Sequence, residues 1–494
     1  MKHVAIFAGA ALCAAAAAAA ATAPLAARPE KWTAKPGRET WQERRHAEKL
    51  AEAAAGPAKT VFIGDSITHF WEKRGREVLA KHFGSGDRKM LNLGFSADRT
   101  EHVLWRIRKG GELDNCKAKF VHIMIGTNNT GHRPQDKEPP ADTILGIREV
   151  LTAVREKQPD AVIVLSSIFP RGAKPNDPKR IRNDIVNEEI RKFCDASQNV
   201  FWCDFSDAFL EADGTLPKTL FPDGLHPSAA GYEIWAEALK PYVNYAFSDR
   251  KGPAPRPRNC IHRTATSRPA DVPAAAWPAT RIRRDTAAKP DWWTRRLLER
   301  RSQIAESGGE FDVVFLGDSI THNWEHKRYG GDALAKLSKT YKILDAGYGG
   351  DRTQHLLWRI RNGELDGYKA KCIMLMIGTN NSARDKAEDV VAGIRAILDT
   401  IAAKQPQAKV LLLPIFPRGA SAADPKRQAN EKVNAAIKAF ADGKQIVWVD
   451  FGAKFLDKDG DVKWIMRDRL HPGPEGYKIW ADAVLPYFKE ACGR

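Results

Sequence analysis

Cysteine is scarce in this chain, with 7 among 494 residues. One of them, Cys13, lies in the apolar N-terminal stretch, and none of the other six belongs to a CxxC pair: Cys116, Cys194, Cys203, Cys260, Cys372 and Cys492. The sequence therefore argues against a disulfide framework, and it leaves the oxidation state of Cys260 and Cys492 open.

Long apolar runs are also missing after the N-terminus, since no later segment approaches the roughly 20 apolar residues that a membrane-spanning helix needs. The chain begins with a short cationic start, a long Ala-rich stretch and a small-residue exit into a charged segment. This layout is typical of a secretory signal peptide, and the alternative is an N-terminal membrane anchor. We expect residues 1–27 to be the signal, and the mature protein to be soluble, exported to the periplasm or outside the cell, and not inserted in a membrane.

Several signatures of cofactor and metal chemistry are absent as well. No GxGxxG follows an expected strand, there is no P-loop, and no His, Cys, Asp and Glu cluster has metal-ligand spacing. We therefore expect no cofactor and no metal. The net charge of +17 raises the question of nucleic acid. Because Lys and Arg alternate with Asp and Glu, we expect no nucleic-acid partner and leave open only a weak attraction to acidic polysaccharide.

What the chain does have is a long internal repeat. "VFIGDSITHFW" at residues 61–71 returns as "VFLGDSITHNW" at 314–324, and "GTNN", "FPRG" and "LHP" each recur in the same order. The repeated serines lie 253 residues apart and the repeated histidines 245 apart. A period of this length indicates a duplicated domain. We expect domains at residues 36–247 and 289–494, joined by a Pro-, Arg- and Ala-rich linker at 248–288.

Each copy alternates short, continuously apolar runs with amphipathic helical patterns, which predicts a parallel sheet covered on both faces. Five such runs per copy favour a flavodoxin-like three-layer α/β/α sandwich. The expected strands lie at residues 59–64, 89–95, 118–126, 160–169 and 199–205, and at 311–317, 341–348, 370–378, 408–416 and 445–451.

Polar residues follow several of these strands, at the sheet edge where sites of open α/β folds form. Ser66 and Ser319 follow the first strand of each copy, a glycine-containing or small-residue turn follows the second, and GTNN follows the third. A serine nucleophile needs a base and an acid that orients it. His226 and His471 each have an aspartate three residues earlier, so one turn can supply both groups.

These four blocks together resemble the SGNH (GDSL) hydrolases. "GGDRTQHLLWRIRNGELD" and "GTNN" are similar in more detail to the catalytic subunits of platelet-activating factor acetylhydrolase and their bacterial relatives. The resemblance covers nearly all of both copies and implies removal of acetyl or other short acyl groups from ester oxygen without metal or cofactor. It implies the following roles: nucleophiles Ser66 and Ser319, bases His226 and His471, orienting acids Asp223 and Asp468, and oxyanion-hole residues Ala97, Asn128, Gly350 and Asn380.

The two copies differ at the strand-two oxyanion position, where the family pattern has glycine. Gly350 matches that pattern and Ala97 does not. If the turn requires a positive φ, alanine is strained there, so we expect the second site to be the more active. Arg171 and Arg418, in the FPRG blocks after strand four, are candidates for substrate contact.

The sequence thus predicts an exported tandem esterase that acts on O-acyl groups, with an O-acylated small molecule or glycan as its substrate. Two other interpretations remain at this point. One is a lipid esterase, lysophospholipase or thioesterase on the same residues, and the other is a carbohydrate-binding protein with a vestigial site. The natural substrate, the acyl group, the signal cleavage position and the oligomeric state are not readable from the sequence.

Overall fold

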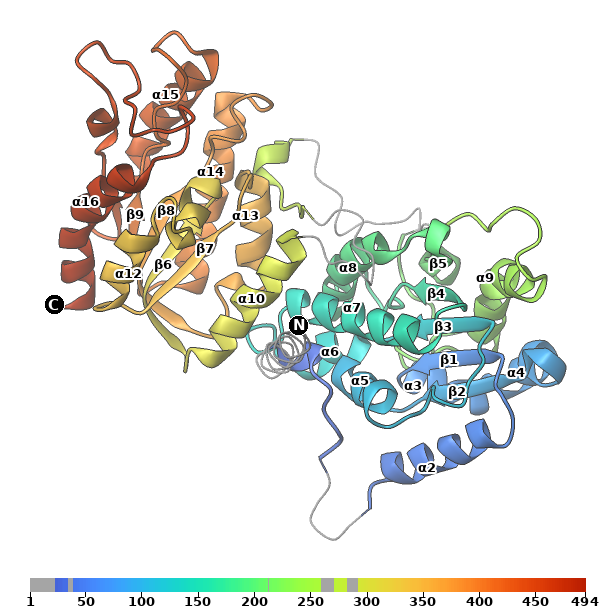
Figure 1. Ribbon diagram of the computed structural model, residues 1–494. Coiled ribbons are helices and arrows are strands. Elements are labelled where there is room, and N and C mark those ends of the chain that lie inside the picture. The colour runs from blue at the N-terminus through green and yellow to red at the C-terminus, as the bar shows by residue number, and fades with distance from the viewer. Residues whose placement is uncertain (1–22, 34–38, 212, 259–270, 282–291) are drawn as a thin grey trace, which may run out of the picture. The chain divides into compact units, whose positions relative to one another are not determined.

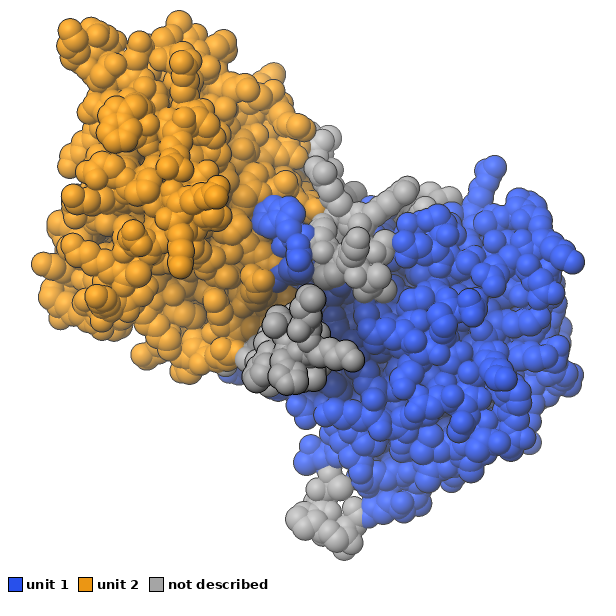
Figure 2. All heavy atoms as spheres, in the orientation of Figure 1, with its two compact units in different colours: residues 1–267, 282–295 blue, residues 268–281, 296–494 orange. Residues whose placement is uncertain are grey.

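The computed structural model of the chain describes residues 23–33, 39–211, 213–258, 271–281 and 292–494 (Figure 1). These residues fall into two compact units, coloured in Figure 2: residues 23–258 with 292–295, and residues 271–281 with 296–494. Most of the predicted signal peptide, and Cys13 and Cys260, lie outside the described residues. Within them, no helix has the length and apolar character needed to cross a membrane. The cysteines of the described ranges carry free thiols: Cys116, Cys194, Cys203, Cys372 and Cys492.

The first unit contains one five-stranded sheet in which every pairing is parallel. Its order is β2-β1-β3-β4-β5. The strands are β1 (Thr60–Gly64), β2 (Met90–Gly94), β3 (Phe120–Met124), β4 (Val162–Ser166) and β5 (Val200–Cys203). The prediction of a flavodoxin-like parallel sheet is confirmed for this copy.

Helices cover both faces of this sheet, which is why its strands are apolar throughout. Phe62 and Val164 belong to a core that also contains Trp235 of α9, while Val61 and Ile63, also buried, alternate with Phe62 along β1 and so face the opposite side. The helices are α2 (Trp41–Ala54), α3 (Ser66–His69), α4 (Arg76–Phe83), α5 (Thr100–Arg108), α6 (Thr127–His132), α7 (Pro140–Lys157), α8 (Pro178–Ile190) and α9 (Ala229–Phe247).

The second unit repeats this architecture, with the same strand order written from the other edge, β10-β9-β8-β6-β7. Its strands are β6 (Glu310–Gly317), β7 (Ile343–Gly347), β8 (Lys369–Met376), β9 (Lys409–Leu412) and β10 (Ile446–Trp448). Its helices are α11 (Ser319–His322), α12 (Gly331–Ser338), α13 (Thr353–Arg359), α14 (Ala387–Lys404), α15 (Pro425–Ile437) and α16 (Pro474–Cys492), and α10 (Trp292–Glu306) leads into the unit. Two separate apolar cores lie on its two sheet faces. The same fold class is therefore confirmed for the second copy.

A short segment before each domain also belongs to the folded units. We call residues 23–33 the first strap and residues 271–281 the second strap. Each contains one turn of 3-10 helix, Leu25–Ala27 or Ala274–Ala276. The carbonyl of Ala26 accepts a hydrogen bond from Thr100 Oγ1 at 2.7 Å, and that of Ala275 accepts one from Thr353 Oγ1 at 2.7 Å. The two straps thus dock in the same way.

A glycine in the neighbouring helix makes room for each strap. A Cβ at Gly146 of α7 would lie 2.3 Å from the carbonyl oxygen of Ala26, and one at Gly393 of α14 would lie 2.4 Å from that of Ala275. Side chains cannot occupy such space without displacing backbone, so the helix glycines and the straps depend on each other.

The straps extend the folded units beyond the segments that we expected to fold. The first strap lies in and just after the expected signal, and the second lies in the expected linker. A sequence signal for them exists, because "PLAARP" at residues 24–29 and "PAAAWP" at residues 273–278 share the pattern P-x-A-A-x-P. The pattern is hard to recognise because the Ala-rich and Pro-rich residues around it are typical of a targeting segment and a linker.

Candidate active site

Each candidate nucleophile is the first residue of a one-turn helix that follows the first strand of its sheet. Ser66 opens α3 after β1, and Asp65 caps that turn by accepting a hydrogen bond from the backbone N–H of Ile67 at 2.9 Å. A Cβ at Gly64 would lie 2.1 Å from Thr68 Oγ1, because the turn folds tightly over the strand end. Ser319 has the same setting, with Asp318 capping Ile320 at 3.0 Å. The glycine permits the tight turn and the aspartate caps it, so the Gly-Asp-Ser sequence holds the serine at the sheet edge.

Burial sets the charge of the capping aspartates. Asp65 and Asp318 are enclosed, and this desolvation raises the pKa of each carboxyl to about 7, against the opposing hydrogen bond from the capped backbone N–H. A large part of each population is consequently protonated near neutral pH. The role that these aspartates have in the structure is to cap the helical turn that begins with the serine.

The structure brings each serine together with its predicted histidine and aspartate. In the first unit His226 Nε2 lies 2.8 Å from Ser66 Oγ, and His226 Nδ1 lies 3.0 Å from Asp223 Oδ2. The histidine arrives from the loop before α9, so residues 160 positions apart meet across the sheet edge. This is the hydrogen-bonded chain that a serine nucleophile requires.

The second unit contains the same chain with closely similar distances. Ser319 Oγ lies 2.9 Å from His471 Nε2, and His471 Nδ1 lies 2.7 Å from Asp468 Oδ2. The other carboxylate oxygen of each aspartate accepts the backbone N–H of its histidine at 2.7 Å, so Asp-x-x-His forms one closed turn.

This turn also keeps the aspartates ionised. Partial burial alone would raise the pKa of Asp223, but hydrogen bonds from the backbone and side chain of His226 outweigh it and lower the pKa to about 2. The pKa of Asp468 is lowered by the same balance. Each histidine therefore faces a carboxylate at neutral pH.

The turn after the second strand of each sheet has a positive φ, the condition under which the sequence analysis expected strain at alanine. Ala97 has φ +68° and Gly350 has φ +73°, both in the left-handed region. Glycine enters this region freely, whereas alanine pays about 1 kcal/mol or more for it. The predicted strain at Ala97 is thus present in the structure.

The candidate oxyanion asparagines are tied to these same turns. Asn128 Nδ2 donates to the carbonyl of Asp98 at 2.9 Å, and Asn380 Nδ2 donates to that of Asp351 at 2.9 Å. An amide nitrogen has two hydrogens, so this bond orients the group and uses one of them. The arrangement places an amide donor beside the strand-two turn in both units.

The straps reach these turns, a contact that sequence reasoning missed. In the first unit Trp32 Nε1 donates to Asp98 Oδ1 at 2.7 Å, and its ring stacks on Phe95 with centroids 5.6 Å apart. In the second unit the last strap residue is Arg281, which donates to the carbonyl of Gly349 and lies 3.7 Å from Asp351. The residue that follows each candidate oxyanion position is therefore held by a strap.

The surroundings of the two histidines differ more than their triads do. Phe70 stacks on His226, with ring centroids 4.7 Å apart, and Arg74 Nη2 lies 3.1 Å from Asp223 Oδ2. The repeat places Asn323 and Lys327 at the corresponding positions of the second copy. Neither Phe70 nor Arg74 was expected at the site, because they lie on the 3-10 helix and the turn that follow the serine, and nothing in the sequence shows which way they point.

Arg171 and Arg418 lie on the GTNN turns. Arg171 Nη1 donates to the carbonyl and to Oγ1 of Thr127 at 2.9 and 3.1 Å, and Arg418 makes the same pair of bonds to Thr379. Each arginine therefore braces the turn that carries the candidate oxyanion asparagine. Substrate contact by these arginines stays a prediction.

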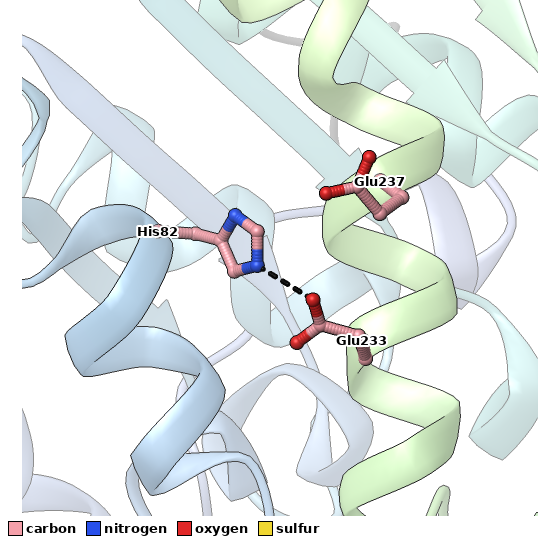
Figure 3. A group of neighbouring side chains, drawn as sticks. All are labelled: His82, Glu233 and Glu237. Carbon is pink, nitrogen blue, oxygen red and sulfur yellow. Dashed lines mark hydrogen bonds and ion pairs between the residues drawn. The ribbon is translucent and has the colours of Figure 1, made fainter.

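Among the described residues one group has the geometry of a cation site, and it lies away from the post-strand loops. Figure 3 shows His82 on α4 facing Glu233 and Glu237 on α9. Lys81 Nζ already lies 2.6 Å from a carboxylate oxygen of Glu233, and Lys240 Nζ lies 3.2 Å from Glu237. These lysines neutralise the carboxylates, so the group reads as a surface ion-pair cluster.

Fold and site together define a class: three-layer α/β/α proteins whose strand-end loops gather a serine, an Asp-x-x-His turn, a strand-two turn and an asparagine. Two regions of the chain, residues 62–234 and 315–479, match the model of the GDSL-like Lipase/Acylhydrolase family. The chain belongs to this family and is an ester hydrolase, with two domains that fit two sites.

Curated relatives agree with this assignment. The chain is 38% identical over 170 residues to platelet-activating factor acetylhydrolase IB subunit alpha2 of Rattus norvegicus, covering 34% of this chain and 72% of the relative. It is 37% identical over 216 residues to the alpha1 subunit of Bos taurus, covering 43% and 88%. The resemblance to this acetylhydrolase group is thus confirmed.

Solved structures also match about one domain at a time. A putative platelet-activating factor of Streptococcus pneumonia is 23% identical, covering 41% of this chain and 92% of that one, with a TM-score of 0.34. An acetyl xylan esterase, AlAXEase, is 20% identical, covering 36% and 98%, with a TM-score of 0.31.

Proposed function

We propose that the protein is an exported serine esterase with two sites, which removes acetyl or other short acyl groups from ester oxygen. The observation that carries this proposal is the hydrogen-bonded Ser–His–Asp chain found twice at equivalent sheet edges. The relatives are acetylhydrolase subunits, which supports a short acyl group.

In the proposed mechanism His226 or His471 accepts the proton of the serine hydroxyl through Nε2 while Oγ attacks the ester carbonyl. The same nitrogen then protonates the leaving alcohol, which gives an acyl-serine. A water molecule, deprotonated by the histidine, hydrolyses this acyl-enzyme and restores the serine. Asp223 and Asp468 orient the imidazole and offset its positive charge during both steps.

The oxyanion of each tetrahedral intermediate needs preorganised donors. We assign this role to the backbone N–H groups of Ala97 and Gly350 and to the side-chain amides of Asn128 and Asn380. The hydrogen bond from each asparagine to the neighbouring turn supports the assignment, because it couples the two donors in one rigid unit. Loss of one such donor typically costs about 10²–10³ in rate.

O-acylated carbohydrate is the proposed substrate class. Its support is the expected export of the chain, since polysaccharides and their acetyl groups lie outside the cytoplasm. Acyl-chain preference distinguishes this proposal from a lipid esterase or a thioesterase.

The test is hydrolysis of 4-nitrophenyl acetate, butyrate and octanoate by the mature protein, by Ser66→Ala, by Ser319→Ala and by the double variant. We expect activity that is highest on acetate and that disappears only in the double variant. Labelling with a fluorophosphonate, followed by peptide mass spectrometry, identifies which serine reacts.

Two outcomes would contradict the proposal in different ways. Activity that rises with chain length points to a lipid substrate on the same residues. Activity no higher in the wild type than in the double variant, together with no fluorophosphonate adduct on either serine, leaves a binding protein.

A further inference from the structure

A groove of about 650 Å³ opens beside the first candidate site. Leu216 and Phe221, both buried, form part of its lining. Arg171, Lys179 and Lys218 also line it, so three cationic side chains surround an apolar patch. Such a surface suits a ring or short chain that carries negative charge.

Two carboxylates, Asp177 and Asp223, line the groove against its three cations. Asp177 caps α8 by accepting hydrogen bonds from the backbone N–H groups of Lys179 and Arg180 at 2.9 and 3.2 Å. Asp223 holds His226 and lies 3.1 Å from Arg74. Lys179 and Lys218 are both exposed, so their ammonium groups are open to a ligand. The groove therefore presents an excess of positive charge.

The position of the groove indicates which part of a substrate enters it. Its lining includes Asp223 and Leu225, which precede His226 in the Asp-x-x-His turn, while Ser66 and His226 themselves lie outside the lining. Because the histidine must protonate the leaving oxygen, the alcohol part of the ester lies on the histidine side of the serine.

We infer that this groove binds the leaving alcohol and selects one that carries negative charge, so that the preferred substrates are acyl esters of acidic sugars. This inference rests on the proposed esterase function and adds the charge of the substrate to it. The anion is a carboxylate or a phosphate, and both forms are included in the test.

The second copy has positive charge at the corresponding turn. Arg467 and Arg469 flank Asp468 there and are exposed, at the positions that Pro222 and Gly224 occupy in the first copy. Arg469 has φ +59°, a left-handed conformation that glycine adopts without strain and arginine does not. Backbone strain beside a candidate active site is a reason to look for a function there, and the cationic side chain of Arg469 matches the inference.

The experiment uses the full-length Ser319→Ala protein, in which only the first site remains. Acetate release is measured from acetylated glucuronic acid and acetylated glucose, and from acetylated glucose 6-phosphate and acetylated glucose, with the ester at the same carbon in each pair. We expect kcat/KM to favour each acid over its neutral partner by roughly tenfold at low salt, and the preference to shrink as salt rises. The glucuronate and phosphate pairs show which anion is preferred.

Two variants in the same background locate the effect. Lys179→Gln with Lys218→Gln should reduce the preference roughly fivefold, as expected for two exposed cations. Lys109→Gln with Lys240→Gln removes the same charge from two positions that do not line the groove and should leave the preference intact. Equal use of acidic and neutral esters, or an equal effect of both variants, would overturn the inference while leaving the esterase proposal standing.

Binding separates this inference from the esterase proposal. Calorimetry with the Ser66→Ala, Ser319→Ala double variant compares a glucuronate trisaccharide with a glucose trisaccharide. If glucuronate binds and this binding is lost with Lys179→Gln and Lys218→Gln, the groove binds an acidic sugar even if no ester is hydrolysed. If neither Ser319→Ala nor the wild type prefers the acid and no glucuronate binds, the groove has no such role.

Discussion

At the scale of single residues, the contrast between Ala97 and Gly350 predicts unequal sites. Alanine occupies the left-handed conformation less readily than glycine, so the first turn spends less time with its N–H aimed at the oxyanion. A cost of about 1 kcal/mol corresponds to roughly fivefold in rate. We expect Ser319→Ala to remove most ester hydrolysis and Ser66→Ala to remove a smaller share, measured as kcat/KM on 4-nitrophenyl acetate.

The reciprocal substitution provides the control for this asymmetry. In the Ser319→Ala background, Ala97→Gly should raise kcat/KM several-fold without lowering thermal stability, because it relieves the backbone strain. Equal losses from the two serine substitutions, with no gain from Ala97→Gly, would show that the turn residue does not set the difference.

A second residue-scale prediction concerns Arg281 and Gly350. A Cβ at Gly350 would lie 2.9 Å from Arg281 Nη1, so the two positions compete for the same space. In the Ser66→Ala background, Gly350→Ala should lower kcat/KM through both backbone strain and displacement of Arg281. Adding Arg281→Ala should recover part of the loss, giving a coupling of about 0.5 kcal/mol or more in a double-mutant cycle.

Arg395→Ala supplies the matched comparison for that cycle. Arg395 lies on α14 with its guanidinium 3.7 Å from the ring centroid of Phe440, away from the turn. The effects of Arg395→Ala and Gly350→Ala on kcat/KM should be additive. Additive behaviour of Arg281 as well would mean that the strap does not position the oxyanion turn.

At the scale of elements, the first strap and α7 form a matched pair. A methyl group at Gly146 would lie 2.3 Å from the carbonyl oxygen of Ala26 and 2.4 Å from Thr100 Oγ1. We therefore expect Gly146→Ala to destabilise the first unit by about 1–3 kcal/mol, as overpacking does, and to shift its urea midpoint downward.

Gly56→Ala is the matched control, because no atom lies within 4 Å of its added Cβ. That substitution should leave the urea midpoint almost unchanged. If Gly146→Ala is equally harmless, the strap is free to move away and its docking contributes little to stability.

Element positions were largely predictable from the sequence. Each apolar run of the repeat became a parallel strand, because a strand buried on both faces must be apolar throughout. The strand ends then brought Ser66 and the Asp-x-x-His turn to one edge, as the topology rule requires. The straps were not predictable from apolar periodicity, since their turn of helix is too short to have any.

At the scale of the whole molecule, the first strap predicts where a signal peptide would be cleaved if the chain is exported as proposed. Ala26 and Ala27 are buried, and Ala26 accepts a hydrogen bond from Thr100, so cleavage after residue 27 would remove part of the folded unit. We expect the exported protein to retain Pro24, with cleavage at an earlier residue. Intact mass and N-terminal sequencing of the secreted chain measure this directly, and a mature terminus at Arg28 or later would contradict it.

The sequence by itself determined the duplicated fold and which residues are candidates for the chemistry, because strand periodicity and motif order are local properties repeated along the chain. Tertiary structure alone decided what surrounds those residues. The stacking of Phe70 on His226, the bond from Trp32 to Asp98 and the cations around the groove join segments far apart in the sequence. Such contacts depend on side-chain direction and loop path, which no local pattern encodes.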